Sequence, residues 1–199
     1  MIVIDGRQTD LSVNNFANLE ELLVKVMEDG ALDNRVVTDV LVNNETFSEV
    51  YPHQAEDIGA SDISRVEIVS VPVSEMAVSI TRELYKVVNL MFEGARHVAD
   101  LFRQADDGEA LELFQDLLDV TRNFLGMVGV LRDEFSAEEH EVINNAMEEL
   151  SGLFSEMLEV TDNSDWILLA DLLEYEFIPA VERWKKVIAQ LREDIRERN

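Results

Sequence analysis

The 199-residue sequence contains no cysteine, three prolines and three histidines, and its 16 Lys and Arg stand against 42 Asp and Glu. The absence of cysteine excludes disulfides, thiolate metal sites, iron–sulfur ligation and cysteine nucleophiles. The shortage of basic residues leaves a formal net charge of −26. Such a chain repels nucleic acid phosphates and anionic lipid headgroups, so we expect neither as a direct partner.

Long uncharged runs are also missing, since the longest, at 11–19 and 123–131, have nine residues each. A membrane-spanning helix needs roughly 20 apolar residues. The first residues do not combine a basic region with a long apolar stretch, as a signal peptide does. Hydrophobic residues still make up 47% of the chain, which excludes wholesale disorder. We therefore expect a folded cytoplasmic protein that does not span a membrane.

Residues 1–72 mix strand-like and helix-like patterns. Strand-like runs at 2–4 and 8–13 flank Asp5-Gly6, and runs at 36–42 and 45–47 flank Asn43-Asn44. Both dipeptides tolerate the positive φ angles of hairpin turns. Between the hairpins, Asn18 is a suitable N-cap for a helix ending near Gly30, and an alternating run at 65–71 predicts a final strand. The inner face of the helix is predicted to carry Leu19, Leu22, Leu23, Val26 and Met27.

This order of hairpin, helix, strand, short strand, loop and final strand resembles the β-grasp fold of ubiquitin-like proteins. The resemblance covers the first 72 residues and implies a sheet that wraps one helix. Many β-grasp relatives carry sulfur or are conjugated through a C-terminal Gly-Gly. Here the last strand continues through Pro72 into a helical pattern without a glycine pair. The resemblance therefore implies a binding or positioning module; the alternative is a small unit that only supports the helices.

Residues 73–199 show helical periodicity in four long segments joined by connections of about five residues or fewer. The segments are Glu75–Arg103, Glu109–Arg132, Ala137–Val160 and a fourth from Asp165 towards Glu197. Short connections favour antiparallel neighbours. The fold class expected is α+β, with a β-grasp-like domain at 1–72 and an antiparallel four-helix bundle at 73–199. Long exposed arms or a helical dimer are the alternatives.

Three local features refine this expectation. The second segment carries a heptad-like seam, typical of coiled coils, at Leu111, Phe114, Leu118, Thr121, Leu125 and Val128, which Leu117, Phe124 and Leu131 widen. Ser74 is the predicted N-cap of the first segment, and Ser136 to Glu139 matches a capping box that would open the third. Pro179 lies inside the fourth segment, where proline removes an amide donor, so the helix is predicted either to kink or to end and restart there.

No pattern of catalytic residues is present, so the sequence does not indicate an enzyme, and no cofactor is implied. Di-iron carboxylate bundles need Glu three residues before His on two helices, but Gly94 precedes His97 and Ala137 precedes His140 at that spacing. Glu93 and His97 are four residues apart and share a helical face. A bundle that binds a metal or small ligand through carboxylates with His97 or His140 remains the alternative hypothesis.

The acidic charge is unevenly distributed. Residues 133–182 contain fifteen acidic residues and no Lys or Arg, and basic residues return at Arg183. We interpret this stretch as a surface for a protein partner, a basic one in the simplest case, centred on Asp171, Glu174, Tyr175 and Glu176. The protein would then be a non-catalytic adaptor or a chaperone-like binder. The alternatives are a purely solubilising face, a nucleic acid mimic that occupies a basic protein, and a homodimer.

Overall fold

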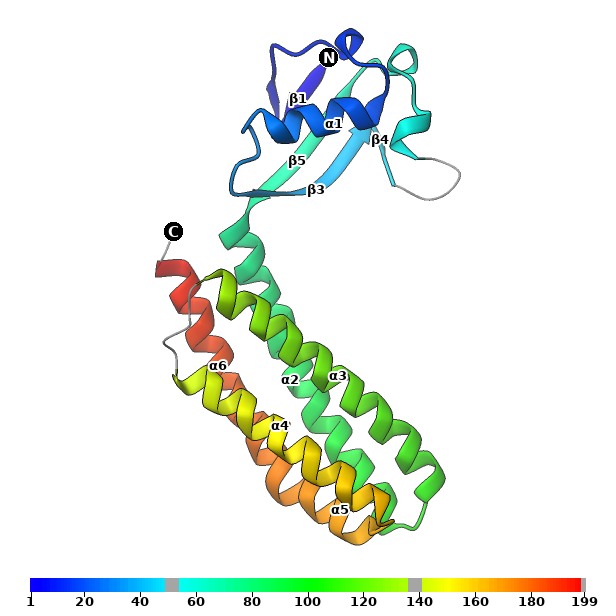
Figure 1. Ribbon diagram of the computed structural model, residues 1–199, viewed down its shortest axis with the longest axis vertical. Coiled ribbons are helices and arrows are strands. Elements are labelled where there is room, and N and C mark those ends of the chain that lie inside the picture. The colour runs from blue at the N-terminus through cyan, green and yellow to red at the C-terminus, as the bar shows by residue number, and fades with distance from the viewer. Residues whose placement is uncertain (49–53, 136–140, 198–199) are drawn as a thin grey trace. The chain divides into compact units, whose positions relative to one another are not determined.

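The computed structural model describes residues 1–48, 54–135 and 141–197. Contacts divide the chain into two compact units, Met1–Met76 and Ala77–Asn199, and each unit is described by itself. Within the described residues the protein is α+β, with a five-stranded mixed sheet followed by a C-terminal region of five helices (Figure 1).

The sheet of the first unit has the strand order β2-β1-β5-β3-β4. Its strands are β1 (Ile2–Ile4), β2 (Arg7–Gln8), β3 (Arg35–Val42), β4 (Glu45–Thr46) and β5 (Val66–Pro72). The central pair β1 and β5 is parallel, and the other neighbouring strands are antiparallel. With helix α1 (Leu19–Glu28) beside it in Figure 1, this mixed sheet is compatible with a β-grasp.

Both predicted hairpins are confirmed, because β1 pairs with β2 and β3 with β4. Asp5, Gly6, Asn43 and Asn44 all have positive φ angles at the two turns. The first hairpin is shorter than expected, since the strand predicted at 8–13 covers only Arg7–Gln8. Val13 begins a 3₁₀ turn (Val13–Asn15) and is buried, so the chain leaves the sheet to bring this side chain into the core.

Helix α1 begins as predicted. The Asn18 side chain accepts a hydrogen bond from the Glu21 amide at 3.0 Å, and Glu21 in turn accepts one from the Ala17 amide at 2.6 Å. These contacts satisfy amides that have no partner within the helix. Leu19, Leu22 and Val26 are buried in the core of the unit. Met27, predicted for the same face, is instead 58% exposed because it lies at the edge of the apolar stripe.

A polar network links the first hairpin to the centre of the sheet. The Ser70 amide and hydroxyl donate to the two carboxylate oxygens of Asp5 at 2.7 and 2.8 Å. Arg35 lies 3.0 Å from the same carboxylate and donates to the Ser70 hydroxyl. These donors, the Ser70 amide above all, hold the pKa of Asp5 below its ordinary value, because they stabilise the charged form against the cost of burial.

The helical region differs from the predicted segments mainly at their ends. Its helices are α2 (Val73–Arg103), α3 (Asp107–Glu134), α4 (Glu141–Asp162), α5 (Trp166–Leu172) and α6 (Ile178–Glu197), with a π-helical segment (Leu173–Phe177) joining the last two. Ser74 is not an N-cap, because α2 already starts at Val73. The predicted capping box at 136–139 lies outside the described residues. No helix among the described residues is both long and apolar enough to cross a bilayer.

The core of the helical region is centred on large aromatic side chains. Phe124 and Trp184 make an edge-to-face pair with ring centroids 5.0 Å apart, and Phe102 stacks on Trp166 at 5.4 Å. The predicted seam of α3 is confirmed in part, because Phe114, Thr121 and Val128 and the three widening residues are buried, whereas Leu111, Leu118 and Leu125 are only half-buried. Spaced alternately four and three residues apart, the buried positions are Ala110, Phe114, Leu117, Thr121, Phe124, Val128 and Leu131.

Candidate partner-binding surfaces

The fourth predicted helix does not end and restart at Pro179. Instead, the π-helical segment Leu173–Phe177 lies just before this residue. In the π-helical segment the Ile178 amide donates to the Leu173 carbonyl, five residues back. Pro179, the second residue of α6, has no amide hydrogen to contribute. A π turn adds one residue to the helical repeat, occurs mostly as a single turn inside an α-helix and is frequent at functional sites.

The π-helical segment carries three consecutive exposed side chains. Leu173 and Phe177 are fully buried, whereas Glu174, Tyr175 and Glu176 between them are exposed. Leu173 and Phe177 are four residues apart, a spacing that keeps two side chains on one face of a helix, so the three residues between them lie on its outer side. The Phe177 ring stacks on Phe154 at 6.2 Å and anchors this end of the segment. The local backbone therefore presents Tyr175 between two carboxylates.

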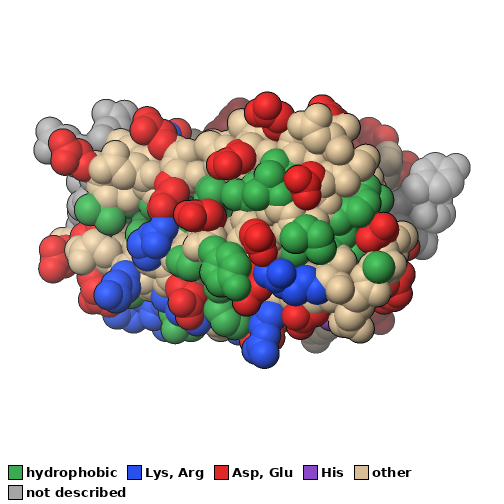
Figure 2. Space-filling view, turned by 90° about the horizontal axis from the view of Figure 1, so that it is seen from below, with side chains coloured by type: hydrophobic (Ala, Val, Ile, Leu, Met, Phe, Trp, Pro, Cys, Tyr) green, Lys and Arg blue, Asp and Glu red, His purple; other side chains and the backbone are tan. Residues whose placement is uncertain are grey.

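Helix α5 and the π-helical segment share an exposed side, which we name the α5 face. It consists of Ile167, Leu168, Asp171, Glu174, Tyr175 and Glu176. Its apolar members are strongly exposed, with Ile167 at 57%, Leu168 at 44% and Tyr175 at 63%. Asp171 is three or four residues from Ile167, Leu168, Glu174 and Tyr175, which keeps these residues on one side, and Glu176 borders them next to Tyr175. Figure 2 views the molecule from the end where Figure 1 places α5, and there apolar side chains are interspersed with Asp and Glu.

An arginine from α2 contacts two carboxylates of the α5 face. Arg103 donates to Asp171 at 2.8 Å and to Glu174 at 2.6 Å. These hydrogen bonds, to Glu174 first and then to Asp171, raise the pKa of Arg103 because they favour its charged form. Among the described residues, neither Tyr175 nor Glu176 has a hydrogen bond or ion pair. The four predicted binding residues thus divide into two that are internally paired and two that remain available.

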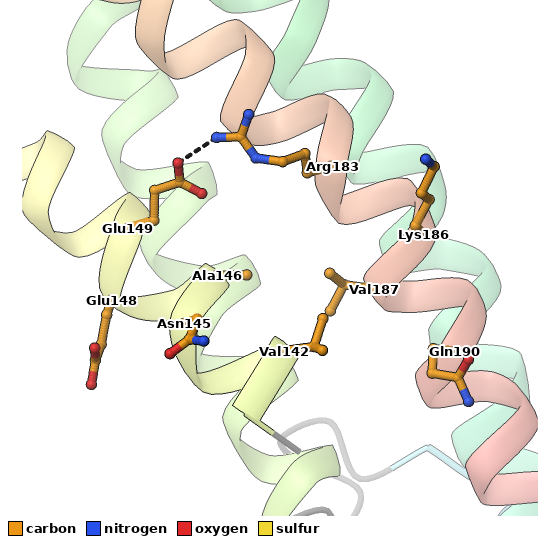
Figure 3. A pocket seen from close by; sticks show the side chains of 9 residues that line it. All are labelled: Val142, Asn145, Ala146, Glu148, Glu149, Arg183, Lys186, Val187 and Gln190. Carbon is orange, nitrogen blue, oxygen red and sulfur yellow. Dashed lines mark hydrogen bonds and ion pairs between the residues drawn. The ribbon is translucent and has the colours of Figure 1, made fainter.

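A groove of about 890 Å³ lies between α4 and α6 (Figure 3). Val142 and Ala146 from α4 and Val187 from α6 supply its apolar surface. An ion pair between Glu149 and Arg183 spans the two helices at one end (Figure 3). Lys186 and Gln190 add polar groups from α6, so the groove lies where basic residues return after the long acidic stretch.

Comparison with protein families matches both parts of the chain. Residues 1–71 match a domain of unknown function (DUF8043), and residues 79–187 match another domain of unknown function (DUF8042). The second match covers more than half of the chain. The protein belongs to the DUF8042 family. No curated protein and no solved structure matched. The DUF8042 match includes Arg103, the α5 face and the α4 side of the groove.

Of the residues predicted for a metal site, the structure describes Glu93 and His97, both within the DUF8042 match. His97 is exposed on α2 and lines a shallow cleft with Glu93, Arg96 and Asp100. Within 1–48, 54–135 and 141–197, no three His, Asp or Glu side chains are grouped so that they could hold a metal ion. His140, the other predicted ligand, lies outside the described residues.

Sequence reasoning missed three residues of this surface. Ile167 and Leu168 belong to the uninterrupted apolar run Trp166 to Ala170, which hides which of its members face outward. Arg103 is distant in sequence, and only the fold brings it to Asp171. The π turn left no signal in the sequence, because Leu173 and Phe177 are four residues apart, as on one face of a regular α-helix.

Proposed function

We propose that the protein is a non-catalytic interaction protein that binds a basic polypeptide through the α5 face. The observation that carries the proposal is the exposure of Ile167, Leu168 and Tyr175 on the side of α5 and the π-helical segment that also carries Asp171 and Glu174, with Glu176 next to Tyr175. Clustered exposed apolar side chains bordered by polar groups are typical of protein interaction sites. Tyrosine is enriched among the residues that dominate binding energies.

The charge pattern defines the chemistry of the partner. Residues 133–182 carry fifteen acids without Lys or Arg, so a segment with Lys or Arg next to apolar residues complements this region. Arg103 neutralises part of the charge of Asp171 and Glu174 and holds them in place. Glu176 is then the carboxylate best placed to accept a hydrogen bond from the partner, beside the Tyr175 ring.

The proposal includes a finer description of the two units. We infer that the first unit is a β-grasp domain that acts as a positioning or binding module. We also infer that the helical region works as a four-helix bundle in which α5, the π-helical segment and α6 form one rod. A rod held by buried Leu173 and Phe177 presents the α5 face in a fixed conformation, which lowers the entropic cost of binding.

The proposal is tested by affinity capture with the full chain and two charge-reversed variants. Glu174→Lys/Glu176→Lys changes the α5 face, and Glu156→Lys/Glu159→Lys makes the same change in net charge at exposed positions of α4. The α5 variant is expected to lose partners that the wild type and the α4 variant retain. Equal recovery by all three proteins contradicts the proposal.

A mimic of nucleic acid is a special case in which the partner is itself a DNA-binding protein. Added duplex DNA would then compete with the protein for the captured partner, and added salt would weaken the complex because exposed charges are screened. A partner that duplex DNA does not displace excludes the mimic and leaves the interaction role intact.

A second candidate function, small-ligand binding, is favoured by the α4–α6 groove. Its volume of about 890 Å³ lies within the range of roughly 300 to 1,000 Å³ found for ligand sites. Its lining carries Glu148 and Glu149 as well as two basic residues, and because Arg183 is paired with Glu149, Lys186 is the cation that would bind an anionic group. The apolar anionic dye anilinonaphthalene sulfonate is a suitable probe. Saturable fluorescence with the wild type that is lost in Ala146→Trp supports this function, and equal fluorescence of both proteins contradicts it.

A further inference from the structure

A second, smaller pocket lies between α2 and α3 and has a volume of about 230 Å³. Its lining is mostly apolar and comes from Leu90, Met91, Val98, Leu113, Leu117 and Val120. Leu90 is 59% exposed, so the pocket opens to solvent beside an uncovered apolar side chain. Among the described residues, His97 and Asp116 are its two titratable lining residues.

Gly94 keeps this pocket open. It lies in the interior of α2, and its φ angle is not in the positive range that favours glycine. A Cβ atom at this position would lie 3.6 Å from the Leu117 Cδ1 atom, which is ordinary van der Waals contact. Neither the backbone nor helix packing therefore requires glycine, although glycine lowers helix stability relative to alanine. The absence of a side chain at Gly94 leaves space in the α2–α3 pocket.

The pocket continues into an acidic cleft. Gly94 and His97 line both the apolar pocket and a shallow cleft of about 510 Å³ that also involves Glu93, Arg96 and Asp100. With Asp116, the combined rim carries three carboxylates and one guanidinium. The surroundings of the apolar pocket are therefore net negative and complement a cation next to an apolar group.

The volume of the pocket indicates what fits inside. An apolar cavity of about 150 Å³ holds benzene, and complete small-molecule sites begin at roughly 300 Å³. The pocket lies between these values, which suits one large side chain better than an independent ligand. Large side chains that fill such pockets are the usual anchors of protein interfaces.

We propose that the α2–α3 pocket binds one large apolar side chain of a partner polypeptide, with a neighbouring Lys or Arg of that partner at the acidic rim. The partner's ring enters beside Gly94 and contacts the apolar lining. Its cation lies between Asp116 and the carboxylates of Glu93 and Asp100. Since none of these residues belongs to the α5 face, the inference does not depend on the function proposed for that face.

The test is a titration of the full chain with the peptide acetyl-Arg-Trp-Arg-amide, followed by NMR of the Leu and Val methyl groups. We expect saturable shifts at Leu90, Leu113 and Val120, and no such shifts with acetyl-Arg-Ala-Arg-amide. Gly94→Leu places a side chain in the pocket and should weaken binding about tenfold or more. Gly126→Leu is the matched control, because Gly126 is an exposed helical glycine with no atom within 4 Å of an added Cβ.

A second variant keeps the test decisive if Gly94→Leu does not fold. Asp116→Lys changes an exposed rim residue and leaves the pocket intact. It should weaken the binding of acetyl-Arg-Trp-Arg-amide and strengthen the binding of acetyl-Glu-Trp-Glu-amide. Absence of methyl shifts in the wild type, shifts outside the pocket, equal binding by both folded leucine variants, or no effect of Asp116→Lys each overturns the proposal.

Discussion

Phe177→Ala tests whether the π-helical segment places the core and the surface as described. The Phe177 ring is fully buried and stacks on Phe154, and burying such a ring contributes about 3 to 5 kcal/mol relative to alanine. Unfolding entropy of about 2.1 cal/mol/K per residue, over a unit of roughly 120 residues, converts this loss into a decrease in Tm of about 12 to 20 °C.

Tyr175→Ala is the matched control, two residues away in the same segment. Its ring is 63% exposed, so the substitution should change the free energy of unfolding by no more than about 0.5 kcal/mol and Tm by about 2 °C. Thermal unfolding followed by far-UV circular dichroism measures both variants. If Tyr175→Ala destabilises as much as Phe177→Ala, the reasoning that places Tyr175 at the surface is refuted.

Three further predictions concern other parts of the chain. The lowered pKa of Asp5 means that its network stabilises the fold above the ordinary carboxyl pKa and that this contribution is lost as pH falls through the lower folded value. The stability difference between wild type and Asp5→Asn, measured by urea unfolding, should therefore shrink below about pH 4, and a constant difference would contradict the network. Gly126→Ala should raise the free energy of unfolding by about 0.5 to 1 kcal/mol in the same assay, because glycine disfavours the helix and no neighbour occupies the added volume; destabilisation would refute this. Arg103→Gln leaves Asp171 and Glu174 without their cation, so trilysine amide should bind the α5 face more tightly in an NMR titration, and weaker binding would show that Arg103 is needed to order the face.

Local chemistry made much of the fold predictable from sequence. Asp5-Gly6 and Asn43-Asn44 indicated the hairpins because few other dipeptides tolerate positive φ angles. Asn18 indicated the start of α1, and Asp165 caps α5 by accepting from the Leu168 amide at 3.1 Å. Patterns confined to a few neighbouring residues are thus read well, since the interactions that determine them are equally local.

The remaining features depend on tertiary packing. Leu111, Leu118 and Leu125 satisfy a heptad pattern as well as the residues that are buried, so the sequence alone could not choose the inner stripe of α3. The same ambiguity explains why Met27 was wrongly predicted to lie on the buried face of α1. In the candidate surface, Glu174 and Tyr175 were predicted from their sequence neighbourhood, whereas their separation into a paired carboxylate and a free ring follows from Arg103 on another helix.

Photo-crosslinking from position 175 shows directly whether a basic partner contacts the α5 face. The full chain carrying benzoylphenylalanine at Tyr175 is compared with the same substitution at Val130, which is equally exposed but lies on α3. We expect an adduct with a basic partner from position 175 that position 130 does not form and that Glu174→Lys/Glu176→Lys abolishes. Absence of an adduct at position 175, or the same adducts from both positions, would contradict it.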